Sequence, residues 1–178
     1  MDDLDNQPQL TDLFNPFWEP LITAIKKVNP AIVNIAEQAE WNSWGVDYIT
    51  KAKVDRVYDF KLLGGIRSFN KKYLTLMADS SFSTFPKGRH QLVFIENHDM
   101  PRFSNGVQHS LPKLKIGAAL NLLIGGVPSI YYGQELGMAG AGGWNKWGMT
   151  DANEIPEREA SEWYKSDTGK GMALWYKN

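Results

Sequence analysis

The sequence predicts an α/β fold in which short apolar strands alternate with helices, and three observations support this prediction. Apolar segments begin near residues 31, 56, 92 and 127, and each precedes a helix or the beginning of one. The segment Leu92–Ile95 is apolar throughout, as expected for a strand buried on both faces. It runs directly into Glu96, Asn97, His98 and Asp99, and polar side chains at the carboxyl end of a strand are typical of a parallel α/β barrel.

The length of the chain decides how much of such a fold it can form. A closed (β/α)8 barrel needs eight strands and typically about 250 residues. The chain has 178 residues, too few to close one. The order of elements fits either a doubly wound sheet or a partial TIM (β/α)8 barrel, and we expect a single partial domain over residues 1–178.

The first predicted unit is a helix followed by a strand. Apolar side chains recur at helical spacing over Pro16–Val28, and Asn29-Pro30 ends the helix. The short apolar run Ala31–Ala36 predicts a strand that leads to Glu37. The stretch Val46–Ala52 is ambiguous.

The middle of the chain predicts one more strand and helix before the apolar run at residue 92. Arg56–Leu62 alternates enough to be a strand, and Leu63–Leu76 is expected to be helical. Ser80–Arg89 is expected to be a loop.

The last third predicts a helix, a strand and a long loop. Leu111–Leu123 is expected to be helical, with a proline in its first turn and two glycines after its end. Val127–Tyr132 is the fourth predicted strand, and it opens the loop Gly133–Gly143. Beyond Trp144 the chain is polar and irregular up to about Asp167, and Met172–Tyr176 could begin a helix.

The composition and net charge of the chain exclude several kinds of partner and metal site. Hydrophobic residues make up 43% of the chain and charged residues 22%, which is ordinary for a globular protein with one core. A formal net charge of −1 gives no attraction to nucleic acid or to an anionic membrane, so neither is expected as a partner. The absence of cysteine excludes disulfides and thiolate metal sites. The acidic first residues do not form a signal peptide, and the compartment stays open.

Two carboxylates follow predicted strands, Glu37 after the first and Asp99 after the third. Hydrolysis of a glycosidic bond uses a pair of carboxyl groups, one of which stays protonated to give its proton to the leaving oxygen. The two residues therefore predict a glycosidase site. The alternative for each is a solvated acid in a loop, and this alternative is stronger for Glu37.

Several motifs resemble those of the α-amylase family, glycoside hydrolase family 13. Phe94-Ile-Glu-Asn-His-Asp99 is similar to the family's Phe-Val-Glu-Asn-His-Asp motif of the seventh barrel strand. Val28–Glu37 resembles the fifth strand, which ends in Gly-Glu in the family and in Ala36-Glu37 here. Gly126–Met138 resembles the eighth strand and its loop, and Ile155–Glu159 resembles the Ile-Pro-Val-Arg-Glu segment beyond it. The resemblance runs from about Phe17 to the last residue.

The resemblance implies roles for four of these residues. Glu37 would be the general acid, with Glu40 as a weaker rival. Asp99 would stabilise the transition state by binding ring hydroxyls, and His98 would hydrogen-bond the sugar whose ring distorts.

Three further residues are candidates for substrate contact. Asn97 would bind substrate or orient its neighbours, and Trp41 and Trp144 could stack on sugar rings. The alternative for both tryptophans is ordinary packing in the core or in a loop. No residue is assigned to a metal.

Parts of the family pattern do not occur in these 178 residues. The nucleophile motif Gly-Phe-Arg-x-Asp and the first-strand motif Asp-x-x-x-Asn-His are both missing. The resemblance therefore implies strands five to eight of the barrel, the second half of the catalytic domain, without the C-terminal β-sandwich domain. We predict that this chain is inactive or nearly so by itself, and that the missing N-terminal half is a partner. The chain is expected to hold no cofactor, and calcium is expected only in the complete parent enzyme.

For the parent enzyme the resemblance implies hydrolysis of α-1,4-glucosidic bonds in starch or maltooligosaccharides, with retention, and favours a secreted or periplasmic location. An α-glucosidase, a cyclodextrin-degrading enzyme or a transglycosylase of the same family is an alternative. A non-catalytic family member that binds sugar or acts as a scaffold is another. The motifs of the chain do not distinguish the first three.

Overall fold

The computed structural model describes residues 13–37, 44–139, 144–145, 148–149 and 165–177. The chain divides into two compact units. The first unit comprises residues 1–93 and 125–127, and the second comprises residues 94–124 and 128–178. The expectation of one partial domain over residues 1–178 stays a prediction.

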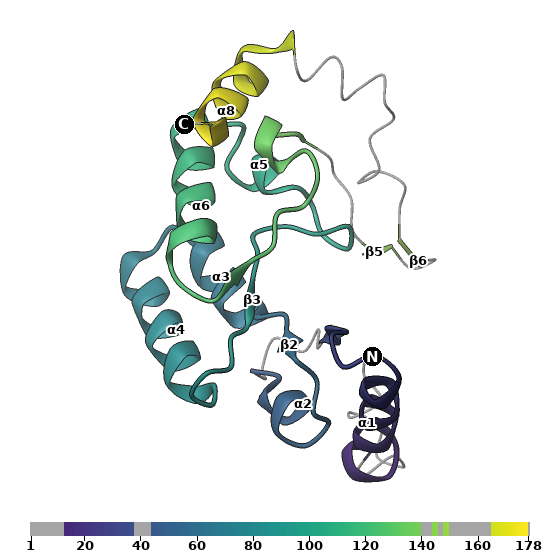
Figure 1. Ribbon diagram of the computed structural model, residues 1–178. Helices are drawn as coiled ribbons and strands as arrows, with labels where there is room; N and C mark the ends of the chain where they lie inside the picture. The colour runs from purple at the N-terminus through teal and green to yellow at the C-terminus, as the bar shows by residue number, and fades with distance from the viewer. Residues whose placement is uncertain (1–12, 38–43, 140–143, 146–147, 150–164, 178) are drawn as a thin grey trace. The chain divides into compact units, whose positions relative to one another are not determined.

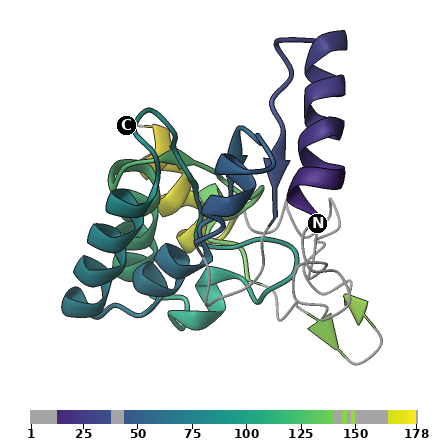
Figure 2. The same ribbon diagram turned by 90° about the horizontal axis from the view of Figure 1, so that it is seen from below.

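The first unit begins with a helical segment that packs against its strands. A π-helical turn, η2 (Phe14–Trp18), continues into α1 (Glu19–Val28), which confirms the helix predicted over residues 16–28. The helix lies beside strand β1 (Ile35–Ala36) in Figure 2. Ile22 of α1 shares a buried cluster with Ala36 of this strand, so the apolar face of the helix covers the strand.

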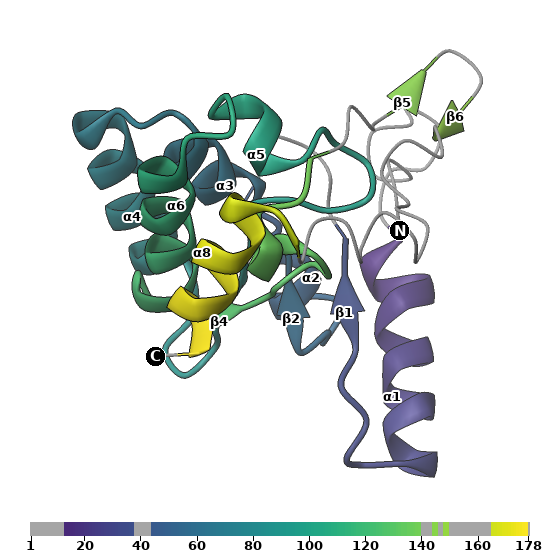
Figure 3. The same ribbon diagram turned by 90° about the horizontal axis from the view of Figure 1, so that it is seen from above.

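The strands of the first unit are short and pair in parallel. β1 pairs with β2 (Arg56–Val57), and the two lie side by side in Figure 3. Tyr58 then forms a parallel bridge with Leu92, which opens β3 (Leu92–Val93). β3 is hydrogen-bonded in turn to β4 (Val127–Pro128). Every predicted strand exists, although each is shorter than expected.

The predicted strand over Arg56–Leu62 is wrong beyond Tyr58, because a helix begins there. The Asp59 carboxylate accepts a hydrogen bond of 2.8 Å from the Leu62 N–H and so caps α3 (Phe60–Arg67). The ambiguous stretch near residue 46 is also helical, α2 (Val46–Thr50).

The single helix predicted over Leu63–Leu76 is in fact two helices. The Asn70 side chain accepts a hydrogen bond of 3.0 Å from the Tyr73 N–H and starts α4 (Lys71–Thr84), which lies beside α3 in Figure 1. The loop predicted over Ser80–Arg89 is therefore wrong up to Thr84. The hydroxyls of Ser83 and Thr84 both donate to the Ser80 carbonyl, at 3.1 and 2.6 Å, and so the polar run stays helical.

The second unit is mainly helical in its described part. α6 (Leu111–Leu123) has the bounds that the sequence predicts, while α5 (Phe103–Gly106) was not predicted. The 3-10 helix η3 (Gln134–Leu136) lies within the predicted loop, and α8 (Asp167–Lys177) begins before the expected Met172. Two short strands, β5 (Trp144–Asn145) and β6 (Gly148–Met149), pair antiparallel.

The core of the second unit forms where α8 meets α6, which lie side by side in Figure 3. Met172 and Leu114 are 1% and 3% exposed. Gly137 has a φ of 64° and lies against both residues, so a side chain there would meet the Leu114 methyl at 3.0 Å. No helix within the described ranges is long and apolar enough to cross a membrane.

Candidate active site

The polar motif follows β3 directly. β3 ends at Val93, but the next two residues, Phe94 and Ile95, still lie in the interior and are each 1% exposed. The chain then reaches Glu96, which is also buried, and turns at His98-Asp99. The apolar run thus carries the motif from the interior to the surface, as the sequence predicts.

Asn97, His98 and Asp99 are brought together in this turn. The Asn97 side-chain oxygen accepts a hydrogen bond of 3.1 Å from the Asp99 N–H, which fixes the turn by a side chain. The His98 Nε2 atom lies 3.4 Å from the Asp99 Oδ1 atom. The His98 side chain is 48% exposed, whereas that of Asp99 is 21% exposed. An imidazole and a carboxylate therefore stand together at the surface.

One oxygen of Asp99 is shielded from solvent. Its Oδ1 atom is buried and accepts no hydrogen bond from any residue that the structure describes. A carboxylate oxygen in this position has free acceptor capacity.

Glu96 points into the interior and binds a second charged side chain. One of its oxygens accepts a hydrogen bond of 2.9 Å from Arg102 Nη1, and the other accepts one of 2.6 Å from the Phe103 N–H. Arg102 Nη1 also donates to the Tyr132 carbonyl at 2.8 Å. Arg102 is fully buried, at 0% exposure. The negative charge of Glu96 is therefore paired inside the second unit.

Aromatic rings cover the Arg102 guanidinium. Its central carbon lies 4.3 Å from the centre of the Tyr131 ring and 4.9 Å from that of Tyr132, within the range of cation–π attraction. Sequence reasoning missed Arg102. The signal was Glu96 itself, because a carboxylate at the end of a buried strand needs a cation or several N–H donors.

The remaining predicted residues lie elsewhere. Glu37 directly follows β1 in the first unit and is half-buried. Trp41, together with its neighbour Glu40, lies outside the described residues. The backbone of Trp144 belongs to β5, and its side chain lies outside the description.

A buried carboxylate in the first unit was not predicted as a polar centre. Asp59 is 1% exposed, accepts a hydrogen bond from the Ser81 hydroxyl, and caps α3. Ser81 in turn accepts a hydrogen bond of 2.7 Å from the Gln91 side chain. Burial raises the pKa of the Asp59 carboxyl above its usual 3.8, although these hydrogen bonds oppose the change.

The cavity behind the motif, lined by described residues, has no room for a sugar. A cavity lined by Glu96, Phe103, Gln134 and Met172 has a volume of about 10 Å³, the space of a single water. The exposed side of the turn, where His98 and Asp99 lie, is open to a ligand instead. In the described ranges no three His, Asp or Glu side chains gather closely enough to hold a metal ion, so no chemistry is assigned to calcium here.

Comparison with known proteins identifies the family. The family described as "Alpha amylase, catalytic domain" matches residues 17–178. A cyclomaltodextrin glucanotransferase from Bacillus sp. (strain 17-1) is 40% identical over 67 residues, which cover 38% of this chain and 9% of that protein. An alpha-amylase from Streptomyces lividans is 29% identical over 113 residues, which cover 54% of this chain and 12% of that protein. The chain thus matches only a small part of the length of these relatives.

The fold is also similar to that of solved enzymes. The ligand-free cyclic alpha-maltosyl-(1→6)-maltose hydrolase from Arthrobacter globiformis has a TM-score of 0.73 at 22% identity, over 94% of this chain and 37% of that one. The same hydrolase has been solved with cyclic alpha-maltosyl-(1→6)-maltose and with maltose. The described structure is part of the barrel fold of these enzymes. By the match over residues 17–178, the chain belongs to the α-amylase family of glycoside hydrolases.

Proposed function

We propose that this chain is part of an enzyme that hydrolyses α-1,4-glucosidic bonds in starch or maltooligosaccharides with retention. The main support for the proposal is the structure of the turn after β3, in a chain that belongs to this family. There the shielded Asp99 Oδ1 lies 3.4 Å from the His98 imidazole, and the Asn97 side chain holds the turn.

Glu37 is the general acid and base of this proposal. It gives its proton to the leaving oxygen and then takes one from the attacking water. Its place directly after β1 supports this role, since catalytic groups of barrel enzymes lie at the carboxyl ends of strands.

Asp99 and His98 bind the sugar ring that reacts. They accept hydrogen bonds from ring hydroxyls and donate hydrogen bonds to them. These bonds strengthen as the ring flattens toward the oxocarbenium-like transition state. The exposed His98 imidazole and the partly exposed Asp99 carboxylate, which lie together at the turn, support this role. Asn97 binds substrate or holds the turn, and Trp41 and Trp144 stack on neighbouring sugars.

The described strands correspond, in this proposal, to strands five to eight of the barrel. Support comes from the order of the motifs along the chain and from the parallel pairings β1–β2 and Tyr58–Leu92. The nucleophile motif Gly-Phe-Arg-x-Asp does not occur in the 178 residues. Because retention requires a covalent glycosyl intermediate, the nucleophile must come from sequence outside them, and this chain alone does not turn over.

A second function within the family has its own support. The similarity to a glucanotransferase, 40% identical over 67 residues, favours transfer of the glycosyl group to another sugar, or action on cyclic glucans. Chromatography of the products would distinguish the two, because hydrolysis releases linear sugars with new reducing ends and transfer does not. One new reducing end for every bond broken, with no product longer than the substrate, would reject transfer.

The test is activity of the chain combined with a separately expressed N-terminal half of an α-amylase that carries the nucleophile. Glu37→Gln should lower turnover of a chromogenic maltooligosaccharide by about 10²–10⁴-fold, because the leaving oxygen loses its proton donor. Asp99→Asn should also lower kcat/KM. The matched controls are Glu19→Gln in the first unit and Asp167→Asn in the second, which should leave activity unchanged. Full activity of Glu37→Gln would reject the assignment of the acid.

A further inference from the structure

We propose that Glu96 and Arg102 are positioning residues that hold the turn carrying His98 and Asp99 in its working conformation. The contacts of Glu96 with Arg102 and with the Phe103 N–H together form the Glu96 clamp. The role of the turn in binding sugar rests on the proposed function. The way the turn is held depends only on the contacts of the second unit.

The Glu96 clamp closes the loop that carries the motif. Glu96 is the residue before Asn97, and its carboxylate binds Arg102 and Phe103 at the far end of the same loop, at 2.9 and 2.6 Å. One side chain therefore ties both ends of residues 97–101. Because Asn97 fixes the Asp99 N–H from within the loop, a rotation at Glu96 would move the Asn97–Asp99 turn as well.

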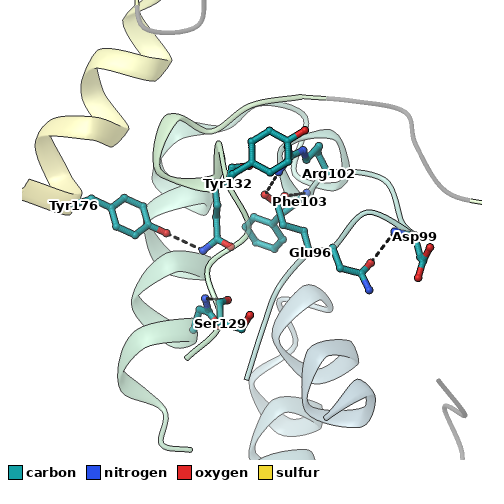
Figure 4. A network of polar contacts seen from close by, with 10 residues as sticks. Glu96, Asp99, Arg102, Phe103, Ser129, Tyr132 and Tyr176 are labelled. Carbon is teal, nitrogen blue, oxygen red and sulfur yellow. Dashed lines mark hydrogen bonds and ion pairs between the residues drawn. The ribbon is translucent and has the colours of Figure 1, made fainter. Parts of the chain in front are cut away.

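The Arg102 guanidinium ties the loop to the segment after β4. Its Nη1 atom donates to Glu96 and to the Tyr132 carbonyl, 30 residues further along the chain, and two tyrosine rings cover it. Figure 4 shows Glu96, Arg102 and Tyr132 converging while Asp99 lies at the outer side of the loop. Arg102 is 0% exposed, so it acts on a ligand only through the turn.

Phe103 fixes the other side of the clamp to helix α6. A Cβ atom added at Gly117 of this helix would lie 2.3 Å from the Phe103 ring, so the ring rests directly on the helix backbone. The N–H that Glu96 binds therefore belongs to a residue whose side chain is locked in place. The loop is therefore held by helix α6, by the segment after β4 and by Glu96, the residue that precedes it.

Stability alone is a weak reason for such a pair. Burying two charges carries a desolvation cost that their attraction only partly offsets, and apolar residues of the same volume are often as stable. Arg102 also leaves its Nε and Nη2 atoms buried without a hydrogen-bond partner in the described part of the chain, which adds to the cost. What a charged pair supplies and an apolar pair does not is fixed direction, because Glu96 accepts from two donors of set geometry.

The experiment uses the 15N-labelled 178-residue chain without ligand. Glu96→Gln keeps the shape of the side chain but places an NH2 group against an N–H donor. Arg102→Lys keeps the positive charge but replaces the planar guanidinium group by an ammonium group. The matched control is Ser166→Ala, which removes the 2.9 Å hydrogen bond from the Gly169 N–H at the start of α8 in the same unit. Backbone amide chemical shifts of residues 97–99 are compared in all four chains, together with the temperature midpoint of unfolding.

Both clamp variants should shift the amide signals of residues 97–99 and 103, while Ser166→Ala should leave them in place at a comparable loss of stability. The proposal is overturned if residues 97–99 keep their shifts in both clamp variants, or if the control moves them equally. In the complemented enzyme the clamp variants should lower kcat by about tenfold or more with KM little changed, because the transition state depends most on the position of Asp99. Wild-type chain that stays inactive on complementation would reject the proposed function, while the amide shifts would still decide the clamp.

Discussion

Asp59 shows how one buried carboxylate links stability to pH. Burial raises its pKa, so the folded chain holds this proton more tightly than the unfolded chain does. Its contribution is fully present below the usual pKa of 3.8 and is lost as pH rises through the folded pKa. The free energy of unfolding of wild type relative to Asp59→Asn should therefore fall as pH rises from about 3 to 7, measured by urea denaturation.

Asp55 lies in the same unit and serves as a control, because its pKa is shifted in the opposite direction. Burial by itself would raise its pKa, but the Asn34 N–H and the Lys26 ion pair at 2.7 Å lower it. Stability relative to Asp55→Asn should be present above pH 3.8 and fall as pH drops through the folded pKa. If the stability of wild type relative to Asp59→Asn and its stability relative to Asp55→Asn change in the same direction with pH, these electrostatic assignments are incorrect.

Tyr176 makes a similar prediction at alkaline pH. Burial raises its pKa to about 12, and the negative charges of Glu96 and Glu135 add to this, while the Gln134 hydrogen bond opposes it. The folded chain should lose stability as pH rises from 10 through 12, and Tyr176→Phe should not show this loss. At neutral pH the same substitution should cost about 1–3 kcal/mol, because the Gln134 NH2 group loses its partner. Urea unfolding at several pH values tests both points, and parallel pH curves for the two chains would refute them.

Single residues also show what the sequence could predict. The turn at His98 and Asp99 was predictable, because a wholly apolar run ended there in polar side chains with no role in a buried strand. The partners of the buried charges were not. Ser81 lies 22 residues from Asp59, and the Tyr132 carbonyl lies 30 residues from Arg102, so no local pattern connects them.

At the scale of elements, the contact between α5 and α6 depends on a glycine. Gly117→Ala should lower the free energy of unfolding by about 1–3 kcal/mol, because the added carbon would lie 2.3 Å from the Phe103 ring and force it to move. This loss should appear although alanine favours helix by about 1 kcal/mol. Gly171→Ala in α8 is the control, since its added carbon meets only the Leu111 methyl groups, at 3.2 and 3.6 Å. Equal stability of the two variants would contradict this packing.

The elements also show where local signals suffice. The bounds of α6 were predicted because Pro112 opens the helix and Gly125 follows its end. The helix beginning at Phe60 was missed, because Asp59 and its cap were read as part of an alternating strand. The end of α4 was missed because Ser80–Arg89 was expected to be a loop, whereas the hydroxyl groups of Ser83 and Thr84 bond to a helix carbonyl.

At the scale of the whole molecule, an unpaired strand edge should govern association. Within the described residues β1 pairs only with β2, and Ile35 of this strand and Val33 just before it are 48% and 61% exposed. Such an edge can pair with another chain. Val33→Lys should reduce concentration-dependent association of the chain in sedimentation experiments, and Ser83→Lys on α4 is the control. Equal association of wild type and Val33→Lys would exclude this edge as the cause.

We propose that these residues supply the acid but not the nucleophile of a retaining glycosidase. The most direct measurement is hydrolysis of a chromogenic maltooligosaccharide by the purified chain, alone and mixed with an N-terminal half that carries the nucleophile. We predict activity only in the mixture and its loss with Glu37→Gln. Turnover by the chain alone, or a mixture that keeps full activity with Glu37→Gln, would contradict the account.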